Sequence, residues 1–210
     1  MSTGFQYIFD NASEIRINKQ PTVAQTVSRD GTIRATSRGG NVWSFQVTPP
    51  PAVAWSELRG VLESIQAKGR HTSDNIQLNA TGYQSWMVPY LGDSDTVTGF
   101  QVDTISGNTC EIATYGSGHN LTSGEKTFKS GDLIQLGTTG HVYTVVSDVT
   151  YPATTITVHR PIIETDATYN LNIGSNCIFK VFCTRMPDPK ITDFKLARFD
   201  GTFEFVEDMT

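Results

Sequence analysis

The stretch Val42–Gln66, VWSFQVTPPPAVAWSELRGVLESIQ, contains the clearest structural signals of the N-terminal part of the chain. Its first six residues alternate between two faces, so Trp43, Phe45 and Val47 are expected to enter one apolar layer from a strand. Pro49–Pro51 then ends that strand, because residues without an amide hydrogen cannot continue a hydrogen-bonded ladder. The stretch therefore predicts a strand that stops abruptly before a helix.

The second half of this stretch predicts a helix over about residues 56–68. Its apolar positions fall on one face: Leu58, Val61, Leu62 and Ile65. Ser56 is expected to cap the start and Gly69 to end it. A helix of this length is marginal alone and has to dock on a sheet. We therefore expect a structural core made of Trp43, Phe45, Val47, Leu58, Leu62 and Ile65.

Two turn signals predict β-hairpins. Arg38–Asn41, with Gly39 and Gly40, is expected to join strands at Thr32–Ser37 and Val42–Val47. Asp200-Gly201 is expected to join a strand holding Phe194, Leu196 and Ala197 to one holding Phe203, Phe205 and Val206.

The middle of the chain changes to short strands at close spacing, which is typical of a small β-barrel or sandwich. The expected strands are Gly99–Ile105, Thr109–Ala113, Leu133–Leu136, Val142–Ser147 and Thr155–His159. A further strand, Cys177–Cys183, has its alternate residues in phase for one core. We therefore predict a mainly β protein (β-sandwich/barrel with one short helix). Its discontinuous outer domain covers residues 1–92 and 180–210, and a small β-barrel is inserted at residues 97–178.

Composition limits the classes of function. The chain has 210 residues, 38% apolar and 18% charged, which excludes a disordered chain, and its many Gly and Pro residues exclude a helical bundle. No apolar run reaches the roughly 20 residues that span a bilayer, and no secretory signal is expected at the start. The net charge of −5 disfavours a dedicated nucleic-acid binder. The three cysteines are expected to be free thiols.

Charge is unevenly distributed along the chain. Residues 97–178 hold 7 acidic and 3 basic residues, net −4. The segment from Arg16 to Arg38 contains five basic residues and a single acidic residue, Asp30, so it is locally basic. A solvated face or a protein-docking surface is the expected role for such a segment.

No motif for catalysis or metal binding is present. The four histidines and three cysteines lack ligand spacing, and no nucleophile elbow occurs. We therefore expect a protein that is not an enzyme and that has no cofactor or metal. One alternative stays open: Tyr83, Trp86 and Tyr90 could form an aromatic platform in a carbohydrate-binding β module, or they could fill the core.

Three stretches resemble proteins of tailed bacteriophages. The first is Val42–Gln66 with Gly69-Arg70 after it, and the last is Phe203–Met209, FEFVEDM. The second lies in the middle and comprises Lys129–Gly137, KSGDLIQLG, with His141–Val145, HVYTV, and Ile156–Ile162, ITVHRPI. In order and separation they are similar to small tail or baseplate structural proteins of the distal-tail or tail-tube-like family.

The resemblance implies a virion component of the tail tube end or baseplate, assembled in the host cytoplasm. Such proteins form rings around the tail axis, hexameric by the symmetry of tails, and dock other tail proteins. No specific nucleic-acid binding and no membrane insertion are expected. The aromatic run near the start is too apolar for a free tail, so we expect the oligomer interface to include Phe5, Tyr7, Ile8 and Phe9.

Overall fold

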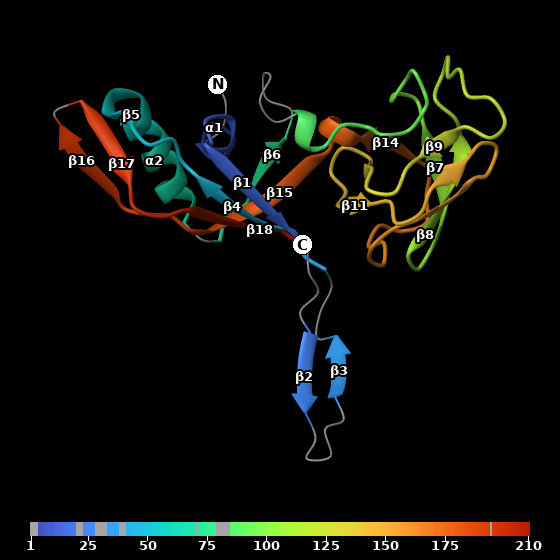
Figure 1. Cartoon of the computed structure of the whole chain (residues 1–210), viewed down its shortest axis with the longest axis horizontal. Helices are drawn as coiled ribbons and strands as arrows, with labels where there is room; N and C mark the ends of the chain where they lie inside the picture. Colours follow the sequence, from blue (N-terminus) through green and yellow to red (C-terminus); the bar gives the residue numbers. More distant parts are fainter. Residues whose placement is uncertain are drawn as a thin grey trace. The chain divides into compact units, whose positions relative to one another are not determined.

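The chain folds into two compact units (Figure 1). The computed structural model describes residues 4–19, 23–27, 33–37, 41–69, 71–78, 85–193 and 195–210. Unit 1 comprises Met1–Asp74 and Val181–Thr210, and unit 2 comprises Asn75–Lys180. The mainly β class is confirmed, with sheets that curl as half-barrels.

The first boundary between the units lies near residue 75, before the expected end of the outer domain at residue 92. The segment that precedes residue 92 is tied to unit 2. Tyr90 donates its hydroxyl hydrogen to the carbonyl of Thr127. The backbone N–H of Leu91 donates to Asp132 Oδ1 at 2.6 Å. These bonds explain why residues 85–92 belong to the inserted unit.

A five-stranded sheet carries the core of unit 1. Its strands, in spatial order, are β1 (Glu14–Asn18), β4 (Ser44–Thr48), β18 (Phe203–Glu207), β15 (Ile178–Arg185) and β6 (Asp74–Gln77). Residues 178–180 of β15 and 75–77 of β6 are counted in unit 2. β18 pairs antiparallel with β4, and Phe205 lies opposite Phe45. The last strand of the chain is therefore central in a sheet that begins with one of the first. All six expected core residues are buried: Trp43, Phe45, Val47, Leu58, Leu62 and Ile65.

A helix that the sequence analysis did not predict, α1 (Gly4–Asp10), opens the described chain. Phe5, Ile8 and Phe9 recur at helical spacing and are all buried, at 0%, 3% and 0% exposure. The ring of Phe5 packs 5.3 Å from that of Phe205. The expected oligomer interface is therefore corrected: three of its four residues lie in the core of their own chain, and only Tyr7 is half-buried.

The predicted helix is α2 (Trp55–Lys68), with Leu58, Leu62 and Ile65 buried. It starts one residue earlier than expected, and its N-cap is Ala54, which makes no side-chain cap, so the expected cap at Ser56 is wrong. Gly69 ends it with φ +59°, where glycine has no Cβ penalty. α2 packs against β5 (Val53–Ala54) and β17 (Leu196–Phe199) of the sheet β16–β17–β5, in which β16 is Pro189–Asp193.

The first expected hairpin is wrong. β3 (Ile33–Ser37) pairs with β2 (Val23–Val27), not with β4. β4 is unavailable because β1 and β18 occupy both of its edges. Residues 38–40 of the expected turn lie outside the described residues.

The Asp200-Gly201 turn joins two sheets instead of two paired strands. β17 pairs with β16 and β5, whereas β18 pairs with β4 and β15. Gly201 has φ +128°, a conformation that favours glycine at such a corner. The expected hairpin across this turn is therefore wrong, and Phe194 lies outside the described residues.

Unit 2 is built mainly from short strands. They are β7 (Gln101–Ser106), β8 (Thr109–Thr114), β9 (Lys126–Phe128), β10 (Leu133–Leu136), β11 (Val142–Thr144), β12 (Val149–Thr150), β13 (Thr155–Thr157) and β14 (Tyr169–Ile173), with short 3-10 helices η1 (Ser85–Met87) and η2 (Gly174–Asn176). Six form a sheet in the order β11-β10-β14-β7-β8-β13, and β12 pairs with β9. Phe100, Phe128 and Tyr143 are the largest side chains of its buried core.

None of the three cysteines, Cys110, Cys177 and Cys183, forms a disulfide bond, and all three are buried. Cys177 and Cys183 flank the in-phase residues Phe179 and Val181, which are also buried.

Among the described residues, no helix has the length and apolar character needed to cross a bilayer.

Candidate functional site

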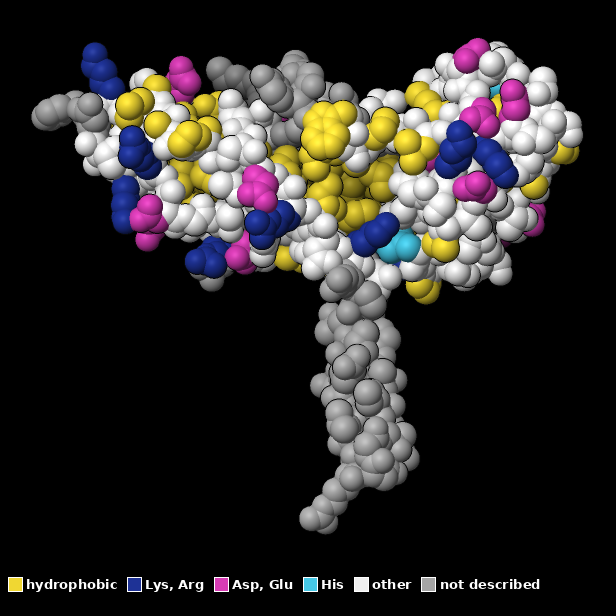
Figure 2. Space-filling model, in the orientation of Figure 1, with side chains coloured by type: hydrophobic (Ala, Val, Ile, Leu, Met, Phe, Trp, Pro, Cys, Tyr) yellow, Lys and Arg dark blue, Asp and Glu magenta, His cyan; other side chains and the backbone are white. Residues whose placement is uncertain are grey.

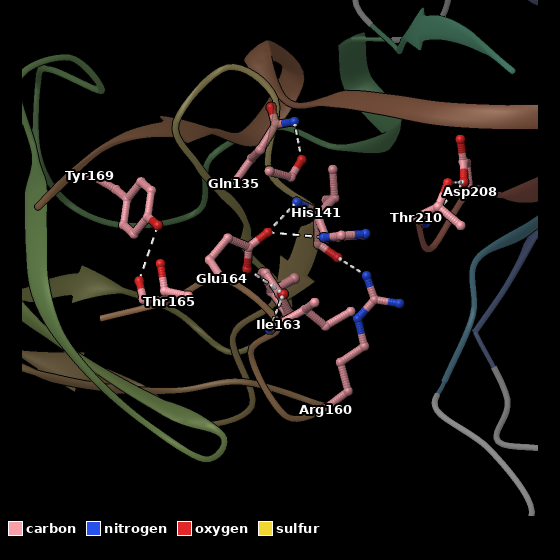
Figure 3. A network of polar contacts seen from close by, with 12 residues as sticks. Gln135, His141, Arg160, Ile163, Glu164, Thr165, Tyr169, Asp208 and Thr210 are labelled. Atoms are coloured by element: carbon pink, nitrogen blue, oxygen red, sulfur yellow. Dashed lines mark hydrogen bonds and ion pairs between the residues drawn. The ribbon is translucent and has the colours of Figure 1, made fainter. Parts of the chain in front are cut away.

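Glu164 is the centre of a polar network in unit 2 (Figure 3). Its Oε1 accepts hydrogen bonds from the backbone N–H of His141 at 2.6 Å and from Nδ1 of the same ring at 3.0 Å. Its Oε2 accepts the hydroxyl hydrogen of Tyr143 at 2.6 Å. The His141 and Glu164 side chains are only 15% and 10% exposed. Three donors therefore converge on one carboxylate that is largely removed from water.

The β10–β11 hairpin positions His141 and Tyr143, the two residues that supply these donors. Its register places Ile134 opposite Tyr143, and the turn Gly137–Gly140 leads directly into His141. Gly140 is required here, because an added Cβ would lie 2.2 Å from the carbonyl oxygen of Leu136 and 2.9 Å from Glu164 Oε1. The turn can approach Glu164 closely only because Gly140 has no side chain.

Gln135 fixes the same turn from inside the unit. Its side chain is 1% exposed, and its Nε2 donates to the carbonyls of Gly140 and Ile178, each at 2.7 Å. Its Oε1 accepts from the backbone N–H of Ile178 at 2.9 Å and from Asn172 Nδ2 at 3.1 Å. A buried amide with each polar atom engaged is expected to rigidify its surroundings.

The hydrogen bonds determine the ionisation of Glu164. Burial by itself raises the pKa of this carboxyl group, but the donors on His141 and Tyr143 outweigh it and lower the pKa to about 2. Burial, with Glu164 as acceptor, raises the pKa of Tyr143. At neutral pH the carboxylate is ionised and the phenol keeps its proton, so Glu164 acts as a hydrogen-bond acceptor and not as a general acid.

Arg160 brings a cation to the same region. It is 3% exposed, and its guanidinium carbon lies 5.1 Å from the centroid of the Tyr143 ring. Its Nη2 donates to the carbonyl of Val142 at 3.2 Å (Figure 3). The buried carboxylate is thus accompanied by a buried cation near the same tyrosine.

A pocket of about 450 Å³ lies beside this network. Its lining consists of Leu136, the turn Gly137–Gly140, His141, Ile163, Glu164 and Tyr169. Tyr169 donates its hydroxyl hydrogen to the carbonyl of Thr165 at 3.0 Å, which fixes the ring at the pocket. We call this feature the Glu164 pocket. It combines an ionised acceptor, an imidazole, two threonine hydroxyls and an apolar wall, which suits binding better than catalysis.

The expected aromatic platform of Tyr83, Trp86 and Tyr90 is not assembled by the described residues. Tyr90 packs edge-on against Phe128 with ring centroids 6.1 Å apart, and burial raises the pKa of its hydroxyl to about 12. Trp86 is 71% exposed, and Tyr83 lies outside the described residues. Tyr90 is therefore partly buried against the core of unit 2, which is close to the other role considered for it.

Charges on the surface are mixed. On the face shown in Figure 2, basic and acidic side chains of the described residues lie intermixed. Two ion pairs illustrate this in unit 2: Lys129 Nζ lies 2.6 Å from Asp93 Oδ1, and Lys126 Nζ lies 3.7 Å from Asp148 Oδ2. Nucleic-acid binding relies on a basic stripe or patch, and such mixing does not provide one on this face.

Glu164 was not among the residues that the sequence pointed to. Its partners His141 and Tyr143 precede it by 23 and 21 residues, so no local spacing marks the network. The available signal is weak: an acidic residue that directly follows the apolar pair Ile162-Ile163. Glu164 lies between β13 and β14, so only the folding of unit 2 brings the three residues together.

No protein-family model matches the chain, and no curated protein matches it. Among the described residues, no group of three or more His, Cys, Asp and Glu side chains is arranged to hold a metal ion. The function is therefore inferred from the residues of this chain and from their geometry.

Proposed function

We propose that the chain is a non-enzymatic structural subunit of a bacteriophage tail, at the tube end or baseplate, where its copies form a ring and bind other tail proteins. The resemblance to tail proteins supports this assignment; it is carried by Val42–Gln66, by Lys129–Gly137, His141–Val145 and Ile156–Ile162, and by Phe203–Met209. The division into a discontinuous unit with an inserted β unit agrees with the layout of that family.

The observation that carries the proposal is the two-stranded ribbon β2–β3 (Figure 1). Within the described residues, β2 and β3 pair only with each other. A two-stranded ribbon is marginally stable alone in water, and each outer edge presents main-chain groups that a further strand can pair with. A neighbouring copy of the chain would supply that strand.

Two more strands support assembly through sheet edges. β1 and β16 are each the terminal strand of their sheets among the described elements. Heterologous contacts between different edges of identical chains generate closed rings when the rotation closes. The proposed mechanism of the protein is therefore main-chain pairing and surface docking between copies.

The mass of the assembled protein tests this proposal. We expect light scattering after size-exclusion chromatography to give a multiple of the chain mass, and electron microscopy of the same fraction to show rings. Mass spectrometry of purified virions should find the chain in the tail. A monomer at micromolar concentration, absent from the particle, contradicts the assignment.

A ribbon variant tests the contact itself. Replacing residues 21–39 by a short Gly-Ser linker should give a monomer whose unit 1 unfolds at an unchanged denaturant concentration. Trp86→Ala, an exposed substitution in unit 2, is the matched control and should leave the assembly intact. Rings that persist without the ribbon would place the contact between copies elsewhere.

A further inference from the structure

The geometry of the Glu164 pocket points to a binding site for one neutral sugar unit of a polysaccharide. The pocket lies wholly within unit 2, and its volume of about 450 Å³ is in the range of about 300–1,000 Å³ typical of small-molecule sites. The assignment does not depend on the tail proposal, because it rests on the pocket alone.

The polar side of the pocket matches hydroxyl groups. The ionised Glu164 carboxylate lines the pocket, and carboxylate oxygens accept hydrogen bonds from hydroxyl groups. Because His141 donates through Nδ1, its Nε2 is an acceptor in the neutral ring. Thr138 and Thr139 are exposed on the turn, and each hydroxyl can both donate and accept. Such a combination of donors and acceptors suits a ligand whose hydroxyl groups also donate and accept hydrogen bonds.

The apolar side of the pocket matches the C–H face of a sugar ring. Tyr169 contributes a ring that its bond to the Thr165 carbonyl fixes in place (Figure 3). Ile163 also lines the pocket and is 47% exposed, so its side chain is available to a ligand. A sugar with one apolar face and a rim of hydroxyls would cover both the aromatic ring and Ile163.

The pocket is largely preformed. Gln135 Nε2 and Asn172 Nδ2 hold the two ends of the turn by bonds of 2.7 Å to the Gly140 carbonyl and 3.3 Å to the Gly137 carbonyl. The backbone N–H of Gly137 donates to the carbonyl of Asn170 at 2.8 Å. A fixed site costs a ligand little ordering free energy, which matters for sugars that bind weakly.

Charged ligands fit this pocket less well. An anion would meet the ionised Glu164 carboxylate. A cation would gain little, because three donors already engage that carboxylate and buried Arg160 lies against Tyr143. The Glu164 carboxylate is thus engaged by protein hydrogen-bond donors, which favours a neutral hydrogen-bonding ligand.

Saturation-transfer NMR on the full chain tests the assignment. The probes are methyl β-glucopyranoside, methyl β-galactopyranoside and N-acetylglucosamine at millimolar concentration, with n-butylammonium as the cationic comparison. We expect transfer to the ring protons of at least one sugar. No transfer to any sugar, or transfer only to n-butylammonium, overturns the assignment.

Two variants at Tyr169 locate the bound sugar. Tyr169→Ala should weaken binding about tenfold because the stacking surface is lost, whereas Tyr169→Phe keeps the ring and should keep binding. An amide NMR spectrum checks that each variant is folded. If Tyr169→Ala proves unfolded, Thr138→Val with Thr139→Val, both on the exposed turn, should weaken binding instead.

Trp86→Ala is the matched control, because Trp86 is an exposed aromatic residue of the same unit that does not line the pocket. It should leave binding unchanged. Binding that survives the pocket variants and disappears with Trp86→Ala would overturn the assignment and place the sugar on Trp86.

Discussion

The rings of Phe9 and Phe205 lie with their centroids 5.0 Å apart, which joins the helix at the start of the chain to the strand at its end. Phe9 also packs 5.6 Å from Phe45 in an edge-to-face arrangement. Both ends of the chain therefore contribute to one aromatic core in unit 1. Aromatic pairs of this kind add about 0.5–1.5 kcal/mol beyond the burial of their area.

Phe9→Ala should lower the free energy of unfolding of unit 1 by about 3–5 kcal/mol, because it leaves a cavity among buried rings. Tyr7→Ala on the same helix is the control and should cost much less, since Tyr7 is only half-buried. Guanidinium unfolding followed by near-UV circular dichroism measures both. If both substitutions have equally small effects on stability, the helix α1 residues are not core residues, and the expectation that they form an interface between copies stands again.

Local patterns in the sequence predicted the elements of unit 1 that depend on local physics. The periodicity of Leu58, Leu62 and Ile65 located α2 within one residue of its start. Alternation placed Phe45 and Val47 in β4. Helical and strand periods are properties of neighbouring residues, so a single sequence contains them.

Strand neighbours could not be predicted in the same way. The Gly39-Gly40 signal predicts a hairpin between the strands that flank it, but β4 pairs with β1 and with β18, a strand more than 150 residues later. Asp200-Gly201 likewise marks a turn, but the flanking strands enter different sheets. Which strands pair depends on how the apolar faces of the strands are buried together. That burial is a property of the folded chain and not of neighbouring residues.

The site was missed for a related reason. Glu164, His141 and Tyr143 meet through the β10–β11 hairpin and the segment after β13, with no motif to mark them. Helix α1 could have been found from Phe5, Ile8 and Phe9 at spacings of three and four residues, but their aromatic character favoured a docking segment instead.

Acid should selectively weaken unit 2. The folded state lowers the pKa of Glu164 from 4.5 to about 2, so its stabilisation is present above pH 4.5 and is lost as the pH falls towards 2. The loss is on the order of 1–3 kcal/mol. Urea unfolding of unit 2 between pH 7 and pH 3 measures it.

Glu164→Gln tests the origin of that acid sensitivity. The variant should be less stable at pH 7 and should show a flatter dependence on pH, because the ionised acceptor is gone. Glu111→Gln, at an exposed glutamate of the same unit, should leave the pH profile unchanged. If Glu164→Gln keeps the full acid sensitivity, another group causes it.

Gly60→Ala should stabilise unit 1 by about 0.5–1 kcal/mol. Gly60 lies inside α2, is exposed, and an added Cβ would meet no atom within 4 Å. The midpoint of guanidinium unfolding should therefore rise without a change in slope. A lower midpoint would mean that this face of α2 is covered by another part of the assembly.

Gly140→Ala should have the opposite effect on unit 2. The added Cβ would lie 2.2 Å from the carbonyl oxygen of Leu136, so the backbone of the turn has to move. We expect the free energy of unfolding to fall by about 1–3 kcal/mol, as for other overpacked sites. Ligand binding in the Glu164 pocket should also weaken, because the displaced turn lines it. Thr139→Ala on the same exposed turn is the control and should leave the unfolding midpoint nearly unchanged.

The cysteines should resist modification in the folded chain, each to a different degree. Burial raises the pKa of Cys110 to about 12 and also raises that of Cys177, so neither forms the reactive thiolate near pH 8. Cys183 is 4% exposed and borders a small pocket with Ile65 and Met186, so a reagent should reach it first. Timed labelling with iodoacetamide and peptide mass spectrometry should therefore show slow alkylation of Cys183 before the other two, and rapid alkylation of all three in guanidinium. Early labelling of Cys110 would contradict the packing of β8 against the core of unit 2.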